Sequence, residues 1–308
     1  MNFTPNISEQ AWGKTHACLL SDGIKNQICI LPKYGGLILF WKHEGVDLTE
    51  TFETEETLMN ELEVTYPNVK LSPFVCRIYQ GQYTWQNQTF QIEPVKAEGH
   101  ALHGWMYKAE FTVKEKLHSP DVARLIIHAS YNREFDFFPF SFDLIITYTL
   151  HRSGEFEITS HYINTGNTSF PLTDGWHPYF ICPEGINQSV LQADVHEYLE
   201  AENLIPTGKQ IAYLPFQKGQ QIGSTHWDTC FLWKEHGKAR LTNPMGTLIM
   251  ENVKGYNFLQ IYTPPHRKSI ALEPLTGAPD AWNNNIGIIS LQPNEKRKFT
   301  VRMKFIRK

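Results

Sequence analysis

Residues 142–166 read FDLIITYTLHRSGEFEITSHYINTG and contain two runs in which large apolar side chains recur at every second position. The first run contributes Phe142, Leu144, Ile146, Tyr148 and Leu150, and the second contributes Phe156, Ile158 and Tyr162. Successive side chains of a β-strand point to opposite faces, so each run predicts a strand with one buried face. The turn residues Ser153-Gly154 between the runs predict that the two strands form an antiparallel hairpin.

The same pattern extends on both sides of this hairpin. Residues 296–308, KRKFTVRMKFIRK, alternate apolar and polar or basic side chains and predict a strand with one face in water. One short helix is predicted within residues 51–63, with Thr51 as its N-cap and acidic residues in its first turn. Further strands bounded by turn residues are predicted within 27–36, 37–48, 82–92, 123–131, 257–263 and 269–274.

Many strands separated by turn residues, without alternating helices, indicate antiparallel sheets packed face to face. We therefore predict an all-β fold: a large antiparallel β-sandwich with few short helices. The 308 residues contain no internal repeat, low-complexity segment or Ser/Gly-rich linker. All-β folds of roughly 200–250 residues are often single domains, so we expect one domain over residues 1–308.

Composition argues against several classes of protein. The formal net charge is −4, and the only basic cluster lies in the C-terminal strand, so neither nucleic acid nor a membrane is an expected partner. No apolar run of about 18 residues predicts a transmembrane helix, and residues 1–10 do not resemble a secretory signal. Five cysteines without CxxC spacing predict neither a disulfide framework nor a zinc finger. A cytoplasmic location is expected.

Four segments place polar side chains in apolar or turn-like surroundings. They are GHALHGW at 99–105, DGWHPYF at 174–180, HWDTCF at 226–231 and IALEPLTGAPDAW at 270–282. The side chains in question are His100, His103, His177, Asp228 and Glu273. Taken singly, each also fits a structural role, such as a core histidine or a turn residue.

His177 and Glu273 carry the strongest signals among these residues. Pro178 biases the backbone of His177 toward an extended conformation, and the neighbouring rings, including Trp176, would enclose its imidazole. Glu273 ends an apolar strand, where a carboxylate must be solvated, paired or used.

Together, these residues predict either a metal site or an acid–base site. His100 and His103 are three residues apart, so on one strand they would point to opposite faces and could not bind one metal in a cupin-like site. Acid–base catalysis needs only one imidazole and one carboxylate placed across a small substrate, with pKa values near the working pH. The acid–base site is the simpler interpretation.

At this point the chain resembles a known family. HALHGW, DGWHPYF, HWDTCF, NFLQIYT and ALEPLTGAPDAWNN occur in the order of the motifs of the aldose 1-epimerase, or galactose mutarotase, family. The resemblance covers about Cys76 to Asn284, and residues 35–48 are similar to the family's opening hairpin. The family fold is a large antiparallel β-sandwich, as the alternation of the strands also predicts.

The resemblance implies a role for each matching residue. His177 matches the general acid that protonates the ring oxygen of the sugar, and Glu273 matches the general base that removes the anomeric proton. The sugar-binding residues that it implies are His103, Arg77, Asp228, Gln260 and Tyr179, the last beside the acid. The implied reaction is interconversion of the α and β anomers of an aldose, an isomerisation that needs no metal or other cofactor. A bell-shaped pH profile is expected.

The chain departs from the family motifs at two positions. Trp105 stands where the family has the second glycine of LHGG, and we expect its indole to pack beneath the site. Cys76 stands where the family has the asparagine of NRI, which removes a hydroxyl partner. Both departures leave the identity of the sugar open.

Three alternatives remain at this stage. A related branch of the superfamily acts on hexose 6-phosphates, and Lys70 or Arg133 would have to supply positive charge beside Arg77. A carbohydrate-binding domain without turnover is the second alternative, although it would not need an opposed acid and base. A glycoside hydrolase is the third, because Glu273 and Asp228 could form its pair of carboxylates.

Overall fold

The computed structural model describes residues 4–93 and 99–308 of the chain. Every strand pair assigned within these residues is antiparallel, and three sheets contain most of the strands. A five-stranded sheet is formed in order by β1 (Asn6–Trp12), β2 (Thr15–Ser21), β3 (Asn26–Leu31), β4 (Leu37–His43) and β5 (Val46–Asp47). The predicted antiparallel, all-β fold is thereby confirmed.

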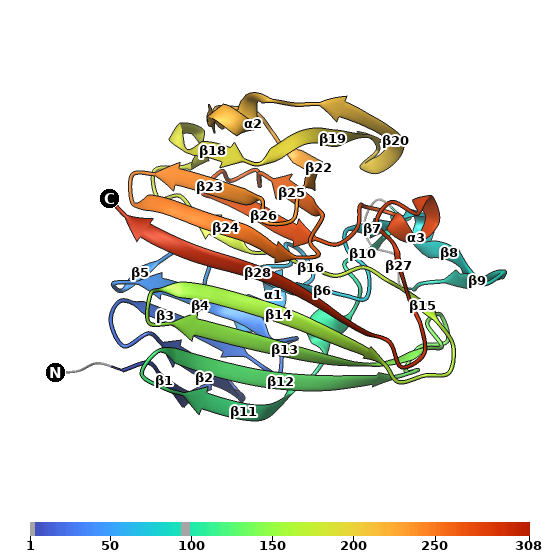
Figure 1. The fold of residues 1–308 in the computed structure, drawn as a ribbon, viewed down its shortest axis with the longest axis horizontal. Helices are drawn as coiled ribbons and strands as arrows, with labels where there is room; N and C mark the ends of the chain where they lie inside the picture. Colours follow the sequence, from blue (N-terminus) through green and yellow to red (C-terminus); the bar gives the residue numbers. More distant parts are fainter. Residues whose placement is uncertain (1–3, 94–98) are drawn as a thin grey trace.

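A nine-stranded sheet forms one face of the molecule (Figure 1). Its strands, in spatial order, are β11 (Thr112–His118), β12 (Val122–Asn132), β13 (Ser141–His151), β14 (Glu155–Asn164), β28 (Lys296–Arg307), β24 (Gly246–Lys254), β23 (Lys238–Asn243), β18 (Val190–Ala193) and β21 (Gln220–Gln221). The predicted hairpin over residues 142–166 is β13–β14, in which Tyr148 lies opposite Ile158.

The third large sheet has eight strands. It contains β20 (Ile205–Ala212), β19 (Val195–Glu202), β22 (Asp228–Trp233), β25 (Phe258–Tyr262), β26 (Ser269–Leu275), β16 (Gly175–Trp176) and β6 (Lys70–Leu71), with β17 (Tyr179–Ile181) also paired to β26. Three two-stranded ribbons complete the strands: β7 (Arg77–Ile78) with β10 (Ala101–Leu102), β8 (Gln82–Trp85) with β9 (Gln88–Gln91), and β15 (Phe170–Leu172) with β27 (Ile289–Leu291).

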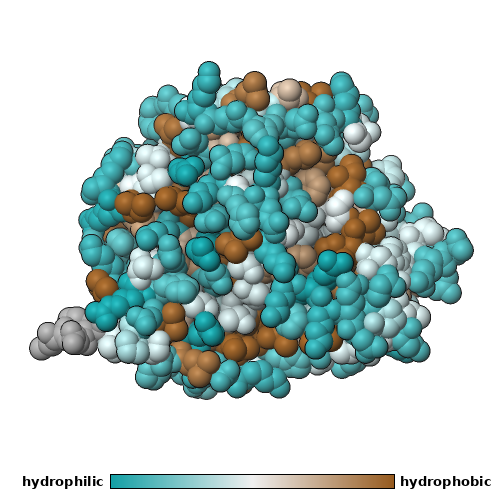
Figure 2. Space-filling view, viewed as in Figure 1, coloured by the Kyte–Doolittle hydropathy of each residue, from teal (hydrophilic) through white to brown (hydrophobic). Residues whose placement is uncertain are grey.

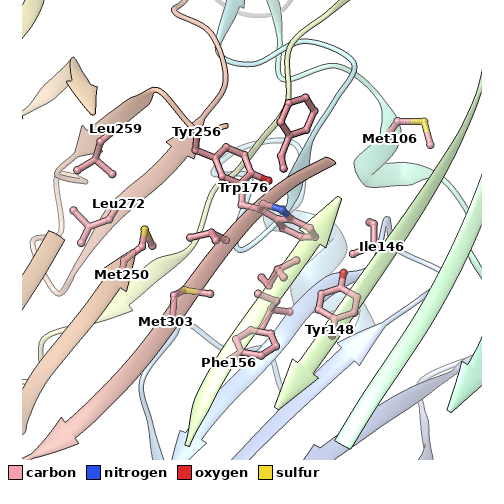
Figure 3. Packing of buried hydrophobic residues seen from close by; sticks show 14 of the residues in the cluster. Met106, Ile146, Tyr148, Phe156, Trp176, Met250, Tyr256, Leu259, Leu272 and Met303 are labelled. Carbon is pink, nitrogen blue, oxygen red and sulfur yellow. The ribbon is translucent and has the colours of Figure 1, made fainter. Parts of the chain in front are cut away.

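One large apolar core joins the three main sheets. The nine-stranded sheet contributes Ile146 and Met303, the five-stranded sheet contributes Trp41, and the eight-stranded sheet contributes Leu259 and Leu272. Figure 3 shows part of this core, including Leu259, Leu272, Ile146 and Met303. The other face of the nine-stranded sheet is polar, because side chains alternate along each strand. Figure 2 shows that this face is mostly hydrophilic, with hydrophobic residues scattered over it.

The eight-stranded sheet presents two different faces. Leu259 and Ile261 of β25 belong to the large core, whereas Gln260, between them in sequence, lies on the opposite face. The same alternation places Leu272 of β26 in the core and Glu273 opposite Gln260. Polar side chains on two neighbouring strands are therefore brought together on the face that points away from the core.

The helices are short. They are α1 (Glu55–Glu61), α2 (Pro215–Lys218) and α3 (Ala281–Asn284), with 3₁₀ turns η1 (Tyr79–Gly81), η3 (Met106–Lys108) and η4 (Ile186–Gln188). The predicted helix within 51–63 is α1, and Glu55 and Glu56 occupy its first turn. The prediction of Thr51 as the N-cap was wrong. Thr54 caps the helix instead, since its hydroxyl accepts a hydrogen bond from the Thr57 amide at 3.1 Å.

A polar cluster lies fully buried between the nine-stranded and eight-stranded sheets. The Lys70 ammonium lies 2.5 Å from the Asp174 carboxylate, and it also donates to the hydroxyl of Ser160 at 3.0 Å. Asp174 accepts hydrogen bonds from the hydroxyls of Tyr162 at 2.5 Å and Tyr256 at 2.9 Å. Burial lowers the pKa of Lys70 to about 8. In the part of the chain that the structure describes, no helix is long and apolar enough to span a membrane.

Candidate active site

A cavity of about 650 Å³ opens on the polar face of the eight-stranded sheet. All seven site residues predicted from the sequence line it: Arg77, His103, His177, Tyr179, Asp228, Gln260 and Glu273. These residues are separated by up to 196 positions along the chain, from Arg77 to Glu273. The fold therefore gathers them into one site of a size that suits a small-molecule ligand.

Three neighbouring strands form the floor of this cavity. Strand pairing sets Glu273 of β26 beside Gln260 of β25, and Gln260 beside Cys230 of β22. The Gln260 amide nitrogen donates to the Asp228 carboxylate at 2.5 Å. Because the side-chain nitrogen of Gln260 makes this bond, the Oε1 atom of the same amide points away from Asp228. Asp228 lies two residues along β22 from Cys230, so it is offset from Glu273 along the strands as well as two strands away.

His177 lies in the short connection between β16 and β17. Its amide donates to the carbonyl of Val69 and its carbonyl accepts from the amide of Asn68, both at 3.0 Å, so its backbone is fixed on both sides. The ring of Tyr179 stacks on the imidazole, with ring centroids 4.8 Å apart. The prediction that Trp176 helps to enclose the imidazole was wrong, because Trp176 belongs to the large core on the other face of the sheet.

Arg77 and His103 reach the cavity from the β7–β10 ribbon. Cys76 and His103 sit at its ends, and the His103 amide donates to the Cys76 carbonyl at 2.8 Å. Both have left-handed backbones, with φ of 50° at Cys76 and 59° at His103. Gly104 must be glycine here, because a Cβ atom on it would lie 2.0 Å from the carbonyl oxygen of Ser72.

The imidazole of His177 and the carboxyl group of Glu273 form a close buried pair. Nε2 of His177 lies 3.3 Å from Oε1 of Glu273, and the side chains are only 7% and 2% exposed. Burial lowers the pKa of His177 to about 3. Burial and the nearby Asp228 carboxylate raise the pKa of Glu273 well above its usual range. Both shifts favour the neutral forms, so the pair holds one proton, on Glu273, across a wide range of pH.

Several buried polar atoms of the cavity have no hydrogen-bond partner within the described residues. They include Oη of Tyr66, Nδ1 of His103, Nδ1 of His177, Oε1 of Gln260 and Oε2 of Glu273. Leaving a buried polar atom unpaired costs roughly 1–3 kcal/mol. A ligand rich in hydroxyl groups would satisfy several of these atoms at once.

The other residues that the sequence suggested for the site do not line the cavity. Nδ1 of His100 accepts a hydrogen bond from the Gln80 amide at 3.0 Å, and His100 does not line the cavity. Trp105 packs against a group of aromatic rings, as expected: Phe74, Tyr131, Phe135, Phe137 and Phe138. Lys70 is held in the buried cluster with Asp174, and Arg133 lies outside the residues that line the cavity.

Some lining residues were missed from the sequence. Tyr66 packs edge-on against the His103 imidazole at 4.5 Å, on a loop where its φ is 53°, and no sequence pattern marks it. Tyr262 lies two residues after Gln260 on the same face of β25, so strand alternation would have found it. At the mouth, His266 lies 3.7 Å from Glu50, which also accepts from the Ser269 hydroxyl at 2.5 Å.

The donor set of the cavity is that of a polar, hydroxyl-binding site rather than a metal centre. Within residues 4–93 and 99–308, no three His, Cys, Asp or Glu side chains are grouped so that they could hold a metal ion. The two cysteines nearest Glu273 are Cys76 and Cys230, and burial raises the pKa of both thiols. Both therefore remain protonated and apolar in character.

Similarity to known proteins identifies the family of this chain. A family model described as aldose 1-epimerase matches residues 19–304. The chain belongs to the aldose 1-epimerase family. The resemblance seen in the sequence motifs is thereby confirmed, and the family is one of isomerases that act on sugars.

Two relatives of this aldose 1-epimerase family member share low sequence identity with it. Two proteins of Escherichia coli K12, both described as uncharacterized, are similar to it. YihR is 24% identical over 254 residues, covering 77% of this chain and 79% of YihR. YphB is 27% identical over 245 residues, covering 73% of this chain and 79% of YphB.

Solved structures of the same fold are also similar. A galactose mutarotase-like protein from Clostridium acetobutylicum has a TM-score of 0.87 at 22% identity, covering 98% of both chains. Galactose 1-epimerase from Lactobacillus acidophilus NCFM has a TM-score of 0.84 at 16% identity, covering 99% of both chains. These likenesses establish the galactose mutarotase-like fold.

Proposed function

We propose that this protein is an aldose 1-epimerase that interconverts the α and β anomers of an unphosphorylated aldose. The observation that carries the proposal is the buried His177–Glu273 pair, 3.3 Å apart, facing a cavity of about 650 Å³. An imidazole and a carboxyl group in this arrangement can exchange protons with two neighbouring oxygens of one sugar. The anomeric hydroxyl and the ring oxygen, both bonded to C1, are such a pair.

The proton balance of the reaction fits this pair. In the direction of ring opening, Glu273 as carboxylate takes the anomeric proton while His177 as imidazolium gives a proton to the ring oxygen. The C1–O5 bond then breaks and C1 becomes an aldehyde. The products of this step are a neutral imidazole and a protonated carboxyl group, the distribution that both pKa shifts favour.

Ring closure uses the same two groups in reverse. After rotation about the C1–C2 bond, Glu273 returns its proton to the carbonyl oxygen, and His177 removes the proton from the O5 hydroxyl as O5 attacks C1. In the free enzyme the proton crosses the 3.3 Å contact between Oε1 and Nε2. General acid–base catalysis of this kind contributes roughly 10²–10⁴-fold to the rate.

The remaining cavity residues suit the binding of neutral hydroxyl groups. Arg77 and Asp228 lie 3.8 Å apart, and Gln260 lies on the strand between those of Asp228 and Glu273. The basic side chains considered for a phosphate, Lys70 and Arg133, do not line the cavity. This arrangement favours a free aldose over a hexose 6-phosphate.

The other two alternatives receive less support. A glycoside hydrolase would use Asp228 and Glu273 as its carboxylates, but Asp228 is engaged by Gln260 and Arg77, whereas His177 is the group in contact with Glu273. A binding domain without turnover would have no use for a buried acid–base pair. Burying these two groups lowers the stability of the fold, and a role in catalysis would explain why both are buried.

The proposal is tested by proton exchange spectroscopy on the anomers of glucose, galactose, xylose and arabinose. The wild-type protein should accelerate exchange of at least one sugar. Glu273→Gln and His177→Asn should each lower kcat by roughly 10²–10⁴-fold, and the double variant should lose little more, because the two groups act as a unit.

Controls use similar side chains outside the cavity. His100→Asn and Glu251→Gln should leave exchange unchanged, since His100 does not line the cavity and Glu251 pairs with Lys238 on the nine-stranded sheet. Saturable binding of a sugar without any acceleration of exchange would replace this proposal with the binding domain.

A further inference from the structure

The backbone around His177 is held by an asparagine that lies outside the cavity. Asn68 is only 1% exposed, lies in the loop between α1 and β6, and is not among the residues that line the cavity. Its backbone amide donates to the carbonyl of His177 at 3.0 Å, and its side-chain Oδ1 accepts from the amide of Tyr179 at 2.9 Å. Asn68 therefore bonds to the chain on both sides of Pro178.

Pro178 explains why a side chain is needed at this point. Proline has no N–H group to donate to a neighbouring strand, and strand pairing is interrupted between β16 and β17. The side-chain amide of Asn68 bridges the interruption, because its Nδ2 also donates to the Glu50 carbonyl at 2.8 Å. The Glu50 amide in turn donates to the Tyr179 carbonyl at 3.0 Å. These bonds close a ring that ties Glu50, Asn68 and Tyr179 together.

The conformation of Asn68 suits this role. Its φ is 53°, in the left-handed region that asparagine adopts more readily than most residues. Its own carbonyl accepts from the Ile38 amide at 3.4 Å, so each polar group of Asn68 has a partner. A buried polar group whose hydrogen bonds are all made gives a rigid support.

The imidazole of His177 has few other contacts that orient it. Its Nδ1 has no hydrogen-bond partner within the described residues, whereas a catalytic base is commonly oriented by a third group. Its Nε2 lies 3.3 Å from Glu273, and its ring meets the rings of Tyr179 and His103 at centroid distances of 4.8 and 5.4 Å. The position of the imidazole therefore depends on the backbone that carries His177 and Tyr179, which Asn68 holds.

We infer that Asn68 is a positioning residue for the acid–base pair. It acts through His177 and Tyr179, since it does not line the cavity in which the sugar would bind. Loss of its side chain lets the segment around Pro178 shift, so that the imidazole no longer faces Glu273 and the ring oxygen together. A misplacement of about 1 Å can cost roughly 100-fold in rate. This inference rests on the proposed function, in which His177 is the general acid.

The test uses Asn68→Gly and a matched control. Glycine adopts a left-handed backbone without strain, so this variant loses the side-chain bonds of Asn68 and keeps its backbone bonds. The control is Asn164→Gly, at the end of β14 and outside the cavity. Asn164 is also 1% exposed, and its side chain accepts from the Gly166 amide at 2.9 Å and donates to the carbonyls of Thr168 and Leu291 at 2.9 and 2.8 Å.

Kinetics are measured on whichever of glucose, galactose, xylose and arabinose the wild-type protein epimerises fastest. Asn68→Gly should lower kcat roughly 10- to 100-fold, with KM changed by less than about 3-fold. Asn164→Gly should leave both values within about 2-fold, although urea unfolding should show a loss of stability in both variants. If Asn68→Gly does not fold, Asn68→Ser has the same expected result, because its hydroxyl is one bond too short to reach the Tyr179 amide. Asn164→Ser is then its control.

Nuclear magnetic resonance of protein with ¹⁵N-labelled histidine reports on the imidazole without any sugar. The Nε2 resonance of His177 is identified by its absence in His177→Asn, and its chemical shift depends on the contact with Glu273. The resonance should shift in Asn68→Gly and stay in place in Asn164→Gly.

Three results would overturn the positioning role: an unchanged kcat in Asn68→Gly, an equal loss of kcat in the two glycine variants, or an unchanged Nε2 resonance in Asn68→Gly. Failure of the proposed function gives a different result, which is no exchange of any sugar by the wild-type protein. In that case the Nε2 resonance alone decides, since a shift confined to Asn68→Gly supports the positioning role and equal spectra contradict it.

Discussion

His177 and Glu273 are buried in surroundings that disfavour charge on either group. Each pKa is shifted toward the neutral form by burial, to about 3 for His177 and well above the usual range for Glu273. Because the two groups are in contact, their titrations belong to the pair rather than to either residue. The pair gains a second proton only in strong acid and loses its proton only well above the usual range of a carboxyl group.

The pH dependence of kcat/KM follows from these shifts. The active pair carries one proton, so the profile should be a broad bell whose acid limb lies near pH 3. Its alkaline limb lies well above the usual titration range of a glutamate, because the pKa of Glu273 is raised. Exchange rates measured from pH 3 to 10 check this. An acid limb near pH 6.5, the ordinary range of an imidazole, would contradict it.

Burial of Glu273 also makes a prediction about stability. Its folded pKa is raised, so above pH 4.5 the unfolded chain releases this proton and the folded protein keeps it, and stability falls as pH rises. Glu273→Gln has no such proton, and its free energy of unfolding should exceed that of wild type by more at pH 8 than at pH 4. Urea unfolding at both pH values measures the difference. A smaller advantage at pH 8 would indicate that the carboxylate is stabilised in the folded protein.

The structure brings together the single residues that the motifs marked. All seven predicted residues line one cavity, and the role of each in the site stays a prediction. Trp176 was misplaced because an extended backbone sends neighbouring side chains to opposite faces of the sheet, and His177 already occupied the cavity face. Tyr66 was missed because it reaches the cavity from a left-handed loop that no periodicity describes.

At the scale of the elements, local pairing was predictable and distant pairing was not. Alternation predicted the β13–β14 hairpin and the C-terminal strand, but no sequence pattern indicated that β28 lies between β14 and β24. The cap of α1 was misplaced by three residues, because Thr51 and Thr54 are equally good capping side chains in isolation. Each is followed by a threonine three residues later, and in the structure it is Thr54 and Thr57 that form reciprocal hydrogen bonds. One domain over the whole chain remains a prediction.

The buried cluster around Lys70 joins strands of two sheets, and its removal should be costly. Lys70→Met leaves the Asp174 carboxylate buried without its cation, which should lower the free energy of unfolding by roughly 3–5 kcal/mol. Adding Asp174→Asn should restore part of this loss. Lys238→Met is the control, because its exposed pair with Glu251 is worth only about 0–1 kcal/mol. Equal losses in the two single variants, measured by urea unfolding, would contradict this role.

At the scale of the whole molecule, charge should select between free and phosphorylated sugars. Besides the protonated Glu273, the cavity is lined by three carboxyl side chains, at Glu50, Glu61 and Asp228, and among the described Lys and Arg residues only by Arg77. The net charge of the chain is −4. Like-charged groups repel, so kcat/KM for glucose 6-phosphate should be roughly 10-fold or more below that for glucose. Added salt should narrow the gap, and a preference for the phosphate would contradict the prediction.

The left-handed backbone around the cavity sets rules for anyone who redesigns it. Cys76 and His103 have φ near 50–59°, as does Tyr66 beside them. Only glycine, asparagine and aspartate adopt this conformation readily, and β-branched residues strain it most. The asparagine of the family motif at Cys76 therefore suits the backbone as well as any hydroxyl. A combinatorial library aimed at new sugars should keep these three positions fixed and diversify the strand positions, where every side chain is sterically allowed.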